Sequence, residues 1–310
     1  MQNSQFAKAL QSGRVLLLDG GLATRLEAQG EDIRGVLWSA KLLQTNPQAI
    51  VAATRAFLEA GADIVETASY QASREGFARC GIGAREADDL MRRSAELAIR
   101  ARDEFLRERR GGRGVPLVAA SIGPYGAILH DGSEYTGNYD LSRTALAAFH
   151  ERRLNVLDTC GLDVLALETI PSLMEAEVLA GVLADCKTPA WVSFSCRDAE
   201  HLCDGTPIGD AAGCFLEHPV VKAVGVNCTA PQHVPGLLRR IRAALPGHAL
   251  IAYPNSGEQY DAVNESWIGT VTPLDCAAAA RDWVAAGAAI VGGCCRMGPE
   301  HIAAMREALS

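Results

Sequence analysis

The sequence is poor in aromatic residues and has no long apolar run. Phe, Trp and Tyr together make up 5% of its 310 residues, and no stretch reaches the roughly 20 apolar residues that span a bilayer. The first residues, MQNSQFAKALQSGR, lack the apolar segment of a secretory signal peptide. We therefore expect a cytoplasmic protein without a membrane partner.

Basic charge is also in short supply, since the net charge is -8. The densest basic segment, residues 107–113, is interrupted by Glu108 and by glycines, as is typical of a solvated helix end. Nucleic acid is therefore not an expected partner. The motifs GxGxxG and GxxxxGK[ST] are missing as well, so we expect no dinucleotide or nucleoside triphosphate as cofactor.

The chain does contain a regular alternation of short apolar runs and longer helical segments. Eight runs predict strands, at residues 15–19, 63–69, 116–121, 163–168, 190–195, 221–228, 249–253 and 288–293. Helices are predicted between them, at residues 47–60, 85–109, 142–159, 173–185, 235–245 and 274–286.

The junctions LEAGADIVET, LDTCGLDVLALET and VAAGAAIVGG each place a glycine between a helix and a strand. Glycine readily adopts the left-handed conformation that ends a helix, and an apolar run suits a parallel strand covered on both faces. Eight such units favour a single (β/α)8 barrel domain over residues 1–310 rather than an open doubly wound sheet, which usually has fewer strands. The residues before Val15 are expected to cover the bottom of the barrel.

Cysteine is abundant, with ten residues. Without a signal peptide, reduced thiols are favoured over a disulfide framework, so metal binding and catalysis are considered first. Cys228 ends the sixth predicted strand, and the adjacent pair Cys294 and Cys295 ends the eighth. Because one strand separates these two strands around a barrel, the three thiols fall within reach of one metal ion.

Three thiolates are suitable ligands for a catalytic zinc ion, whose fourth tetrahedral position stays open to water or substrate. The alternative is that they are ordinary buried cysteines. A disulfide between sequence neighbours would need a strained ring. The other cysteines lie on or beside predicted helices or after the fifth strand, and the seven histidines show no HExxH spacing. We therefore predict one zinc ion per chain.

The reacting groups of such a barrel come from the carboxyl ends of its strands. Asp19 ends the first strand before Gly20 and Gly21, where backbone N–H groups can approach an anion such as a substrate carboxylate. The alternative is a loop aspartate that caps the following turn. Glu168 ends the fourth strand, where a carboxylate needs a cationic or donor partner. Asp19 and Glu168 together are candidates for binding an α-ammonium group.

Thr67, Gln71 and Asn227 complete the candidate substrate-binding residues. Thr67 and Gln71 are interpreted equally well as loop scaffolding. The segments HDGSEYTGNYD and DGTPIGD are polar loops suited to covering a small ligand.

In order along the chain, DGG, ETASYQA, SIGPYG, ALET, GVNC, YPNSGE and GGCCR resemble the homocysteine S-methyltransferase family. That family includes betaine-homocysteine methyltransferase and the homocysteine-binding module of cobalamin-dependent methionine synthase. The match runs from Asp19 to Arg296. DGG alone is a weak motif, but GVNC followed by GGCC at this separation is highly specific.

The resemblance implies a (β/α)8 barrel in which the three cysteines hold zinc with the homocysteine sulfur as fourth ligand. It also implies that Asp19 and Glu168 bind the homocysteine amino group, while amides near Gly20 and Gly21 bind its carboxylate. The strings SEYTGNYD and YPNSGEQYDA are most similar to the branch that uses S-methylmethionine, with S-adenosylmethionine as a poorer donor.

The expected activity is zinc-dependent transfer of a methyl group from this donor to homocysteine, which gives methionine. Tyr70, Tyr125 and Trp191 are candidates for contact with the donor sulfonium, although each of them is more often a core residue. Alternatives are betaine as donor, a related thiol or selenol such as selenocysteine as acceptor, a zinc- or thiol-binding sensor, and an unrelated barrel lyase with fortuitous cysteines. The sequence leaves the oligomeric state open.

Overall fold

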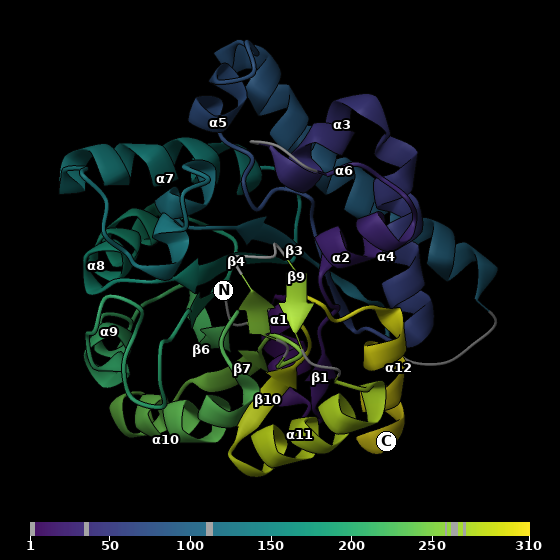
Figure 1. Ribbon diagram of the computed structural model, residues 1–310, viewed down its shortest axis with the longest axis vertical. Helices are drawn as coiled ribbons and strands as arrows, with labels where there is room; N and C mark the ends of the chain where they lie inside the picture. The colour runs from purple at the N-terminus through teal and green to yellow at the C-terminus, as the bar shows by residue number, and fades with distance from the viewer. Residues whose placement is uncertain (1–3, 34–36, 110–113, 258, 262–265, 269–270) are drawn as a thin grey trace.

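The computed structural model describes residues 4–33, 37–109, 114–257, 259–261, 266–268 and 271–310. An eight-stranded parallel sheet forms its centre (Figure 1). The strands are β1 (Leu16–Leu17), β2 (Ile64–Glu66), β3 (Leu117–Ile122), β4 (Val164–Ile170), β5 (Ala190–Phe194), β6 (Val221–Asn227), β7 (Ala249–Tyr253) and β10 (Ala288–Val291). They are hydrogen-bonded in the order β1-β10-β7-β6-β5-β4-β3-β2.

The two end strands of this order, β1 and β2, meet and close the sheet. A parallel bridge joins Leu18 to Ile64. The Asp19 amide donates to the Ile64 carbonyl at 3.0 Å, and the Asp63 amide donates to the Leu17 carbonyl at 2.6 Å. The predicted (β/α)8 barrel is therefore confirmed.

Helices surround the barrel, as Figure 1 shows. The principal ones are α4 (Pro47–Ala60), α6 (Ala84–Glu108), α7 (Arg143–Leu157), α8 (Leu173–Val182), α10 (Val234–Ala244), α11 (Pro273–Ala285) and α12 (Pro299–Ala308). Shorter helices are α1 (Gln5–Gln11), α2 (Leu22–Ala28), α3 (Leu42–Thr45), α5 (Arg74–Ala78) and α9 (Ile208–Gly213). Within the described residues, no helix has the length and apolar character needed to cross a membrane.

The three predicted junction glycines all lie between a helix and the next strand and adopt left-handed conformations. Gly61, Gly161 and Gly287 have φ angles of 108°, 70° and 102°, in the left-handed region that favours glycine. The α4 helix begins with Pro47 in its first turn and is capped at its C-terminus by Gly61. Proline is common at the start of helices and glycine at their ends.

The N-terminal helix α1 closes the bottom of the barrel, which confirms that expectation. Phe6 is fully buried, and its ring centroid lies 5.9 Å from that of Trp191. The Trp191 Nε1 donates to Tyr253 Oη at 3.1 Å inside the barrel. Trp191 is therefore a core residue, which was the favoured interpretation of this side chain, rather than a contact for the sulfonium.

An antiparallel hairpin after β7 was not predicted. Its strands are β8 (Gln259–Asp261) and β9 (Ser266–Ile268), and Figure 1 draws β9 in front of the barrel while α1 lies behind it. Strands of three residues are too short to show the alternation of apolar and polar residues that identifies a strand in a sequence.

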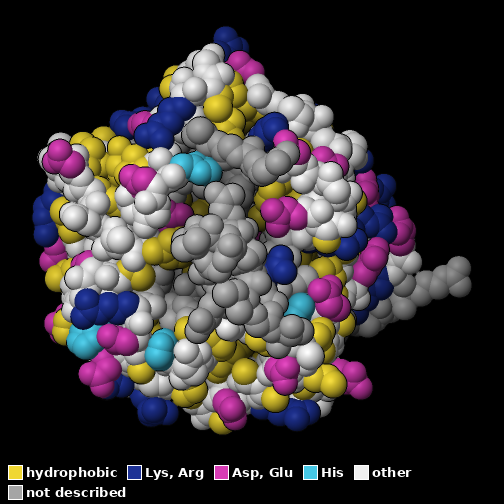
Figure 2. Space-filling model, viewed as in Figure 1, with side chains coloured by type: hydrophobic (Ala, Val, Ile, Leu, Met, Phe, Trp, Pro, Cys, Tyr) yellow, Lys and Arg dark blue, Asp and Glu magenta, His cyan; other side chains and the backbone are white. Residues whose placement is uncertain are grey.

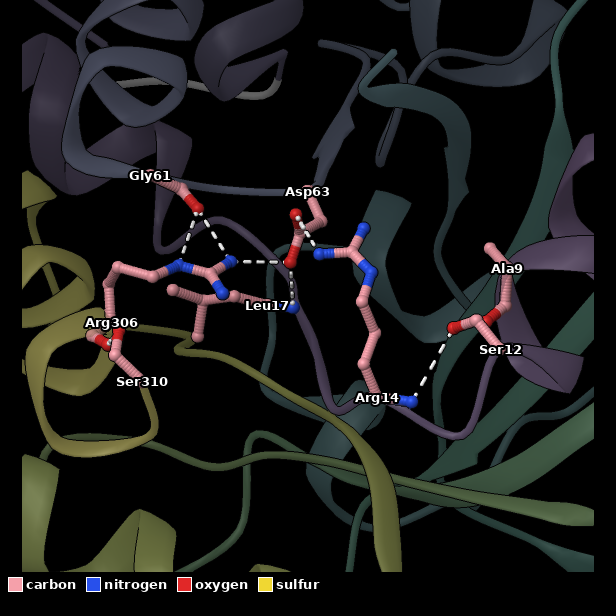
Figure 3. A network of polar contacts seen from close by, with 8 residues as sticks. All are labelled: Ala9, Ser12, Arg14, Leu17, Gly61, Asp63, Arg306 and Ser310. Atoms are coloured by element: carbon pink, nitrogen blue, oxygen red, sulfur yellow. Dashed lines mark hydrogen bonds and ion pairs between the residues drawn. The ribbon is translucent and has the colours of Figure 1, made fainter. Parts of the chain in front are cut away.

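Asp63, at the start of β2, ties the β1–β2 junction to both ends of the chain (Figure 3). Its Oδ2 accepts a hydrogen bond from the Leu17 amide at 2.9 Å, and its Oδ1 accepts one from Arg14 Nη1 at 3.1 Å. Arg306 of α12 pairs with the same carboxylate and donates to the Gly61 carbonyl at 2.7 Å. Asp63 is 7% exposed, so water compensates little for the loss of these contacts.

We expect Asp63→Ala to lower the free energy of unfolding by about 2–4 kcal/mol, because it leaves the buried Leu17 amide without its acceptor and Arg306 without its carboxylate partner. Urea denaturation followed by circular dichroism measures the change. Asp89→Ala, at an exposed position of α6, is the matched control and should cost less than about 0.5 kcal/mol. Equal midpoints for the two variants would contradict this account of the junction.

Candidate metal centre and substrate pocket

A cavity of about 200 Å³ lies at the carboxyl ends of the strands. Its lining comes from several strand ends, and includes Gly20, Glu66, Glu168, Cys228 and Cys294. Acidic and basic side chains are interspersed over the face shown in Figure 2. This face has no dominant sign of charge, so selection of a charged ligand depends on the groups inside the pocket.

The three predicted cysteines lie together in this pocket. Cys294 Sγ is 3.2 Å from Cys228 Sγ, and Cys228 Sγ is 3.7 Å from Cys295 Sγ. The three sulfur atoms all lie within 4.8 Å of one another, and in the described part of the chain they form the one group of His, Cys, Asp or Glu side chains able to share a metal ion. All ten cysteines are free thiols.

The spacing of the sulfur atoms fits a zinc ion. Tetrahedral zinc with Zn–S bonds of about 2.3 Å places its sulfur ligands about 3.8 Å apart. The Cys294–Cys228 and Cys228–Cys295 separations, 3.2 and 3.7 Å, lie within about 0.6 Å of that value. Cys228 has a φ angle of 47°, a left-handed conformation that is uncommon for a residue other than glycine and that occurs often at functional sites.

The three thiols share charge unequally. Hydrogen bonds from Cys228 and Cys294 hold the pKa of Cys295 well below its usual range. The pKa of Cys228 is raised, first by its hydrogen bonds to Cys294 and Cys295 and then by its burial. The cluster thus favours one thiolate that its neighbours stabilise. A set of sulfur ligands of this kind prefers soft metal ions.

Asn227, at the end of β6, is held by protein groups on both sides of its amide. Its Oδ1 accepts from the Thr169 amide at 2.7 Å and from Ser193 Oγ at 2.8 Å. Its Nδ2 donates to Thr169 Oγ1 at 2.8 Å and lies 4.0 Å from Cys294 Sγ. These contacts favour a role in positioning the sulfur atom of Cys294 over direct contact with substrate.

Asp19 and Glu168 are buried in the pocket, at 2% and 4% exposure. Asp19 Oδ2 accepts from the Glu66 amide at 2.8 Å, but Asp19 Oδ1 is buried and has no partner among the described residues. Ser121 Oγ donates to Glu168 Oε1, and Tyr253 Oη donates to Glu168 Oε2 at 3.1 Å. Burial raises the pKa of Glu168 to about 7 and raises that of Asp19 well above its usual range.

Glu66 is a pocket residue that the sequence prediction missed. Its Oε1 is buried and has no partner within the described residues. Burial, followed by the charge of Glu168, raises the pKa of Glu66 well above the usual range. The available signal was its place in the strand-end motif VETASYQAS, but the strand was expected to run to Ser69 and actually ends at Glu66.

The other two predicted residues after β2 differ in position. Thr67 lines the pocket, where its Oγ1 contacts Ser69 Oγ at 2.6 Å and accepts from the Ser121 amide at 3.1 Å. Gln71 is not among the lining residues. Its Nε2 donates to the Ala127 carbonyl at 2.9 Å, which is the scaffolding role weighed for it above.

Gly20 and Gly21 allow the first loop of the barrel to pack against the last. A Cβ atom at Gly20 would lie 2.2 Å from the Met297 carbonyl oxygen, and one at Gly21 would lie 2.7 Å from that of Cys294. The Gly21 amide already donates to Met297 at 2.9 Å. The Gly20 amide has no protein acceptor in the described structure, so it is the better candidate of the two for binding an anion.

Arg153 of α7 is fully buried, and its guanidinium holds two loops at the pocket. It donates to the carbonyls of Ala72 at 2.9 Å, Gly123 at 2.6 Å, Tyr70 at 2.7 Å and Ser69 at 3.2 Å. A Cβ at Gly123 would lie 2.6 Å from the Tyr70 ring, so the ring is seated on the Gly123 backbone. Sequence reasoning missed Arg153, since an arginine in a helix gives no sign of its distant partners.

We expect Arg153→Met to destabilise the fold by about 3 kcal/mol, because four carbonyl groups lose a buried charged donor. Hydrogen exchange should accelerate in residues 69–73 and 123–126, as followed by mass spectrometry. Arg93→Met, at an exposed position of α6, should leave exchange in these loops unchanged. Unaltered exchange in both loops of the Arg153 variant would show that the arginine does not hold them.

The family model described as homocysteine S-methyltransferase matches residues 16–309. The chain belongs to the homocysteine S-methyltransferase family. It is therefore a methyltransferase enzyme, as the resemblance of its motifs implied.

Individual relatives agree over almost the whole length. A homocysteine S-methyltransferase of Bacillus subtilis (strain 168) is 46% identical over 291 residues, which cover 93% of this chain and 92% of the relative. A homocysteine S-methyltransferase of Escherichia coli (strain K12) is 44% identical over 311 residues, with 98% of each chain covered.

A solved structure has the same fold. The metallated form of the homocysteine methyltransferase MmuM from Escherichia coli superimposes with a TM-score of 0.87 at 41% identity, and the match covers 97% of this chain and 98% of that one. The matched structure of that relative is metallated, and in this chain three thiols form a group that could hold a metal ion.

Proposed function

We propose that this enzyme transfers a methyl group from a sulfonium donor to the thiol of homocysteine and holds one zinc ion on Cys228, Cys294 and Cys295. S-Methylmethionine is the proposed donor, with S-adenosylmethionine as a poorer one. The observation that carries the proposal is the cluster of three sulfur atoms within 4.8 Å of one another, set in a pocket with buried carboxylates. A soft-ligand metal site beside an acidic pocket suits a substrate that has both a thiol and an ammonium group.

Zinc, when bound, supplies a positive charge that favours the thiolate form of a substrate thiol, whose pKa is otherwise about 8.5. The three protein ligands leave one tetrahedral position for the substrate sulfur. Asn227 keeps Cys294 in place through a network that uses both of its amide atoms.

Asp19 and Glu168 are proposed to bind the α-ammonium group of homocysteine. Asp19 Oδ1 lacks a donor within the described residues, and an ammonium group has three N–H donors to offer. Ser121 and Tyr253 fix the Glu168 carboxylate by donating to one oxygen each. The Gly20 amide is proposed to bind the substrate carboxylate, whereas the Gly21 amide is occupied by Met297.

The methyl transfer itself needs no nucleophilic protein side chain. The thiolate sulfur of homocysteine supplies the electron pair of the new S–C bond, and the pair of the broken bond stays on the donor sulfur. A negative sulfur and a positive sulfur both become neutral, so a site that excludes water favours the transition state. The main contribution of the protein is then to align the two sulfur atoms with the methyl group between them.

The purified enzyme, prepared without chelators, should contain one zinc ion per chain by mass spectrometry of the metal. Cys294→Ser should lose the zinc and at least about 100-fold of the methyl transfer rate, because a hydroxyl group is a poor replacement for a thiolate ligand. Cys80→Ser, at an exposed position, should retain both. Stoichiometric zinc and full activity in Cys294→Ser would refute the metal assignment.

The donor is tested by measuring methionine formation from homocysteine with S-methylmethionine, S-adenosylmethionine or betaine. We expect the highest kcat/KM with S-methylmethionine, because its branch of the family is the one that the motifs most resemble. Betaine should be a poorer donor, because its amine is a poorer leaving group than the thioether that a sulfonium releases. Preference for betaine would contradict the donor assignment. Binding of zinc and homocysteine without methyl transfer from any donor would favour a sensor instead. Comparing the methyl transfer rates to homocysteine and to selenocysteine distinguishes a thiol methyltransferase from a selenol methyltransferase.

A further inference from the structure

The loop after β3 adds an acidic and an aromatic side chain to the pocket beside Cys228. It contains the short helices η2 (Tyr125–Ile128) and η3 (Ser133–Tyr135). Glu134 and Tyr135 line the pocket, and Tyr135 Oη lies 3.9 Å from Cys228 Sγ. Neither residue is used by the proposed homocysteine site at Asp19 and Glu168.

Glu134 is partly buried, and its Oε2 is shielded from solvent without any hydrogen-bond partner in the described structure. A buried carboxylate oxygen without a donor is unfavourable unless a cation approaches it. Arg296, the basic residue in the pocket lining, makes no hydrogen bond to this oxygen. Burial raises the pKa of the Glu134 carboxyl group, and the nearby His130 opposes that shift only in part.

The position of Glu134 is fixed by packing. A Cβ at Gly126 would lie 2.4 Å from the Glu134 amide nitrogen and 2.8 Å from the ring of Tyr139. The Tyr139 hydroxyl in turn donates to Glu175 Oε2 at 2.8 Å, and Glu175 is fully buried. The loop is therefore anchored to the core, and Glu134 is held among the residues that line the pocket.

We infer that Glu134 is the residue that recognises the positive charge of the methyl donor, with Tyr70 and Tyr135 as aromatic contacts for the sulfonium. This inference rests on the proposed function. Tyr70 is well suited to the role because its ring is seated on Gly123 and its backbone is held by Arg153. Aromatic rings and a carboxylate together attract a cation that has little hydrogen-bonding capacity of its own.

The reaction changes the charge of the group that Glu134 is inferred to bind. The donor sulfur is positively charged before transfer and is a neutral thioether afterwards, because the electron pair of its broken S–CH3 bond remains on it. Glu134 therefore attracts the donor more strongly than the demethylated product. Loss of the charge weakens binding at the moment when the product has to leave.

The test is Glu134→Gln, which keeps the shape of the side chain and removes its charge. We expect the KM for S-methylmethionine to rise at least tenfold, with the KM for homocysteine and the zinc content changed by less than twofold. The inhibition constant of methionine, which lacks the sulfonium, should also change by less than twofold. Glu134→Asp should be intermediate, and Glu96→Gln, at an exposed position of α6, should match the unmodified enzyme.

The outcomes separate the two proposals. An unchanged KM for S-methylmethionine in an active Glu134→Gln enzyme would overturn the role of Glu134 and leave the proposed function intact. Equal losses for donor, homocysteine and zinc in both Glu134 variants would also overturn it, because they would show a structural role. If the unmodified enzyme accepts no sulfonium donor, the proposed function fails, and the inference fails with it.

Discussion

Three thiol groups held within 4.8 Å of one another dominate the mouth of this barrel. Each thiol alone would keep its proton in a buried site, but in contact they favour a thiolate on Cys295. The surrounding loops maintain this crowding. Gly20 and Gly21 let the first loop lie against the carbonyls of Met297 and Cys294, where any side chain would push the cysteine loop away.

The second constraint is electrostatic. Asp19, Glu66 and Glu134 each present a buried carboxylate oxygen that no described protein group satisfies. Unpaired acidic groups are costly in a folded protein, and this cost is consistent with the proposed role of the pocket in binding cationic ligands. Two ligands with an ammonium or sulfonium group, brought together beside the sulfur cluster, would satisfy these oxygens in a way that no neutral substrate could.

Much of this organisation could be predicted from the sequence, because it depends on local signals. The junction glycines at 61, 161 and 287 marked the turns between helices and strands, and cysteines at the ends of the sixth and eighth predicted strands had to converge in a closed barrel. The misses depend on contacts that are distant in sequence or on a strand end misplaced by a few residues. The early end of β2 brought Glu66 into the pocket and left Gln71 outside it, and nothing in the α7 sequence indicates that Arg153 reaches four carbonyl groups.

The ion pairs at Asp63 also bear on how the molecule is made. The carboxylate that seals the junction of β1 and β2 is held by Arg306, in the last helix. During synthesis the chain emerges from its N-terminus, so the first two strands are exposed long before that arginine is available. The junction thus gains its full set of contacts only after translation of α12, and the sulfur cluster cannot assemble before Cys294 and Cys295, which follow β10, have been made.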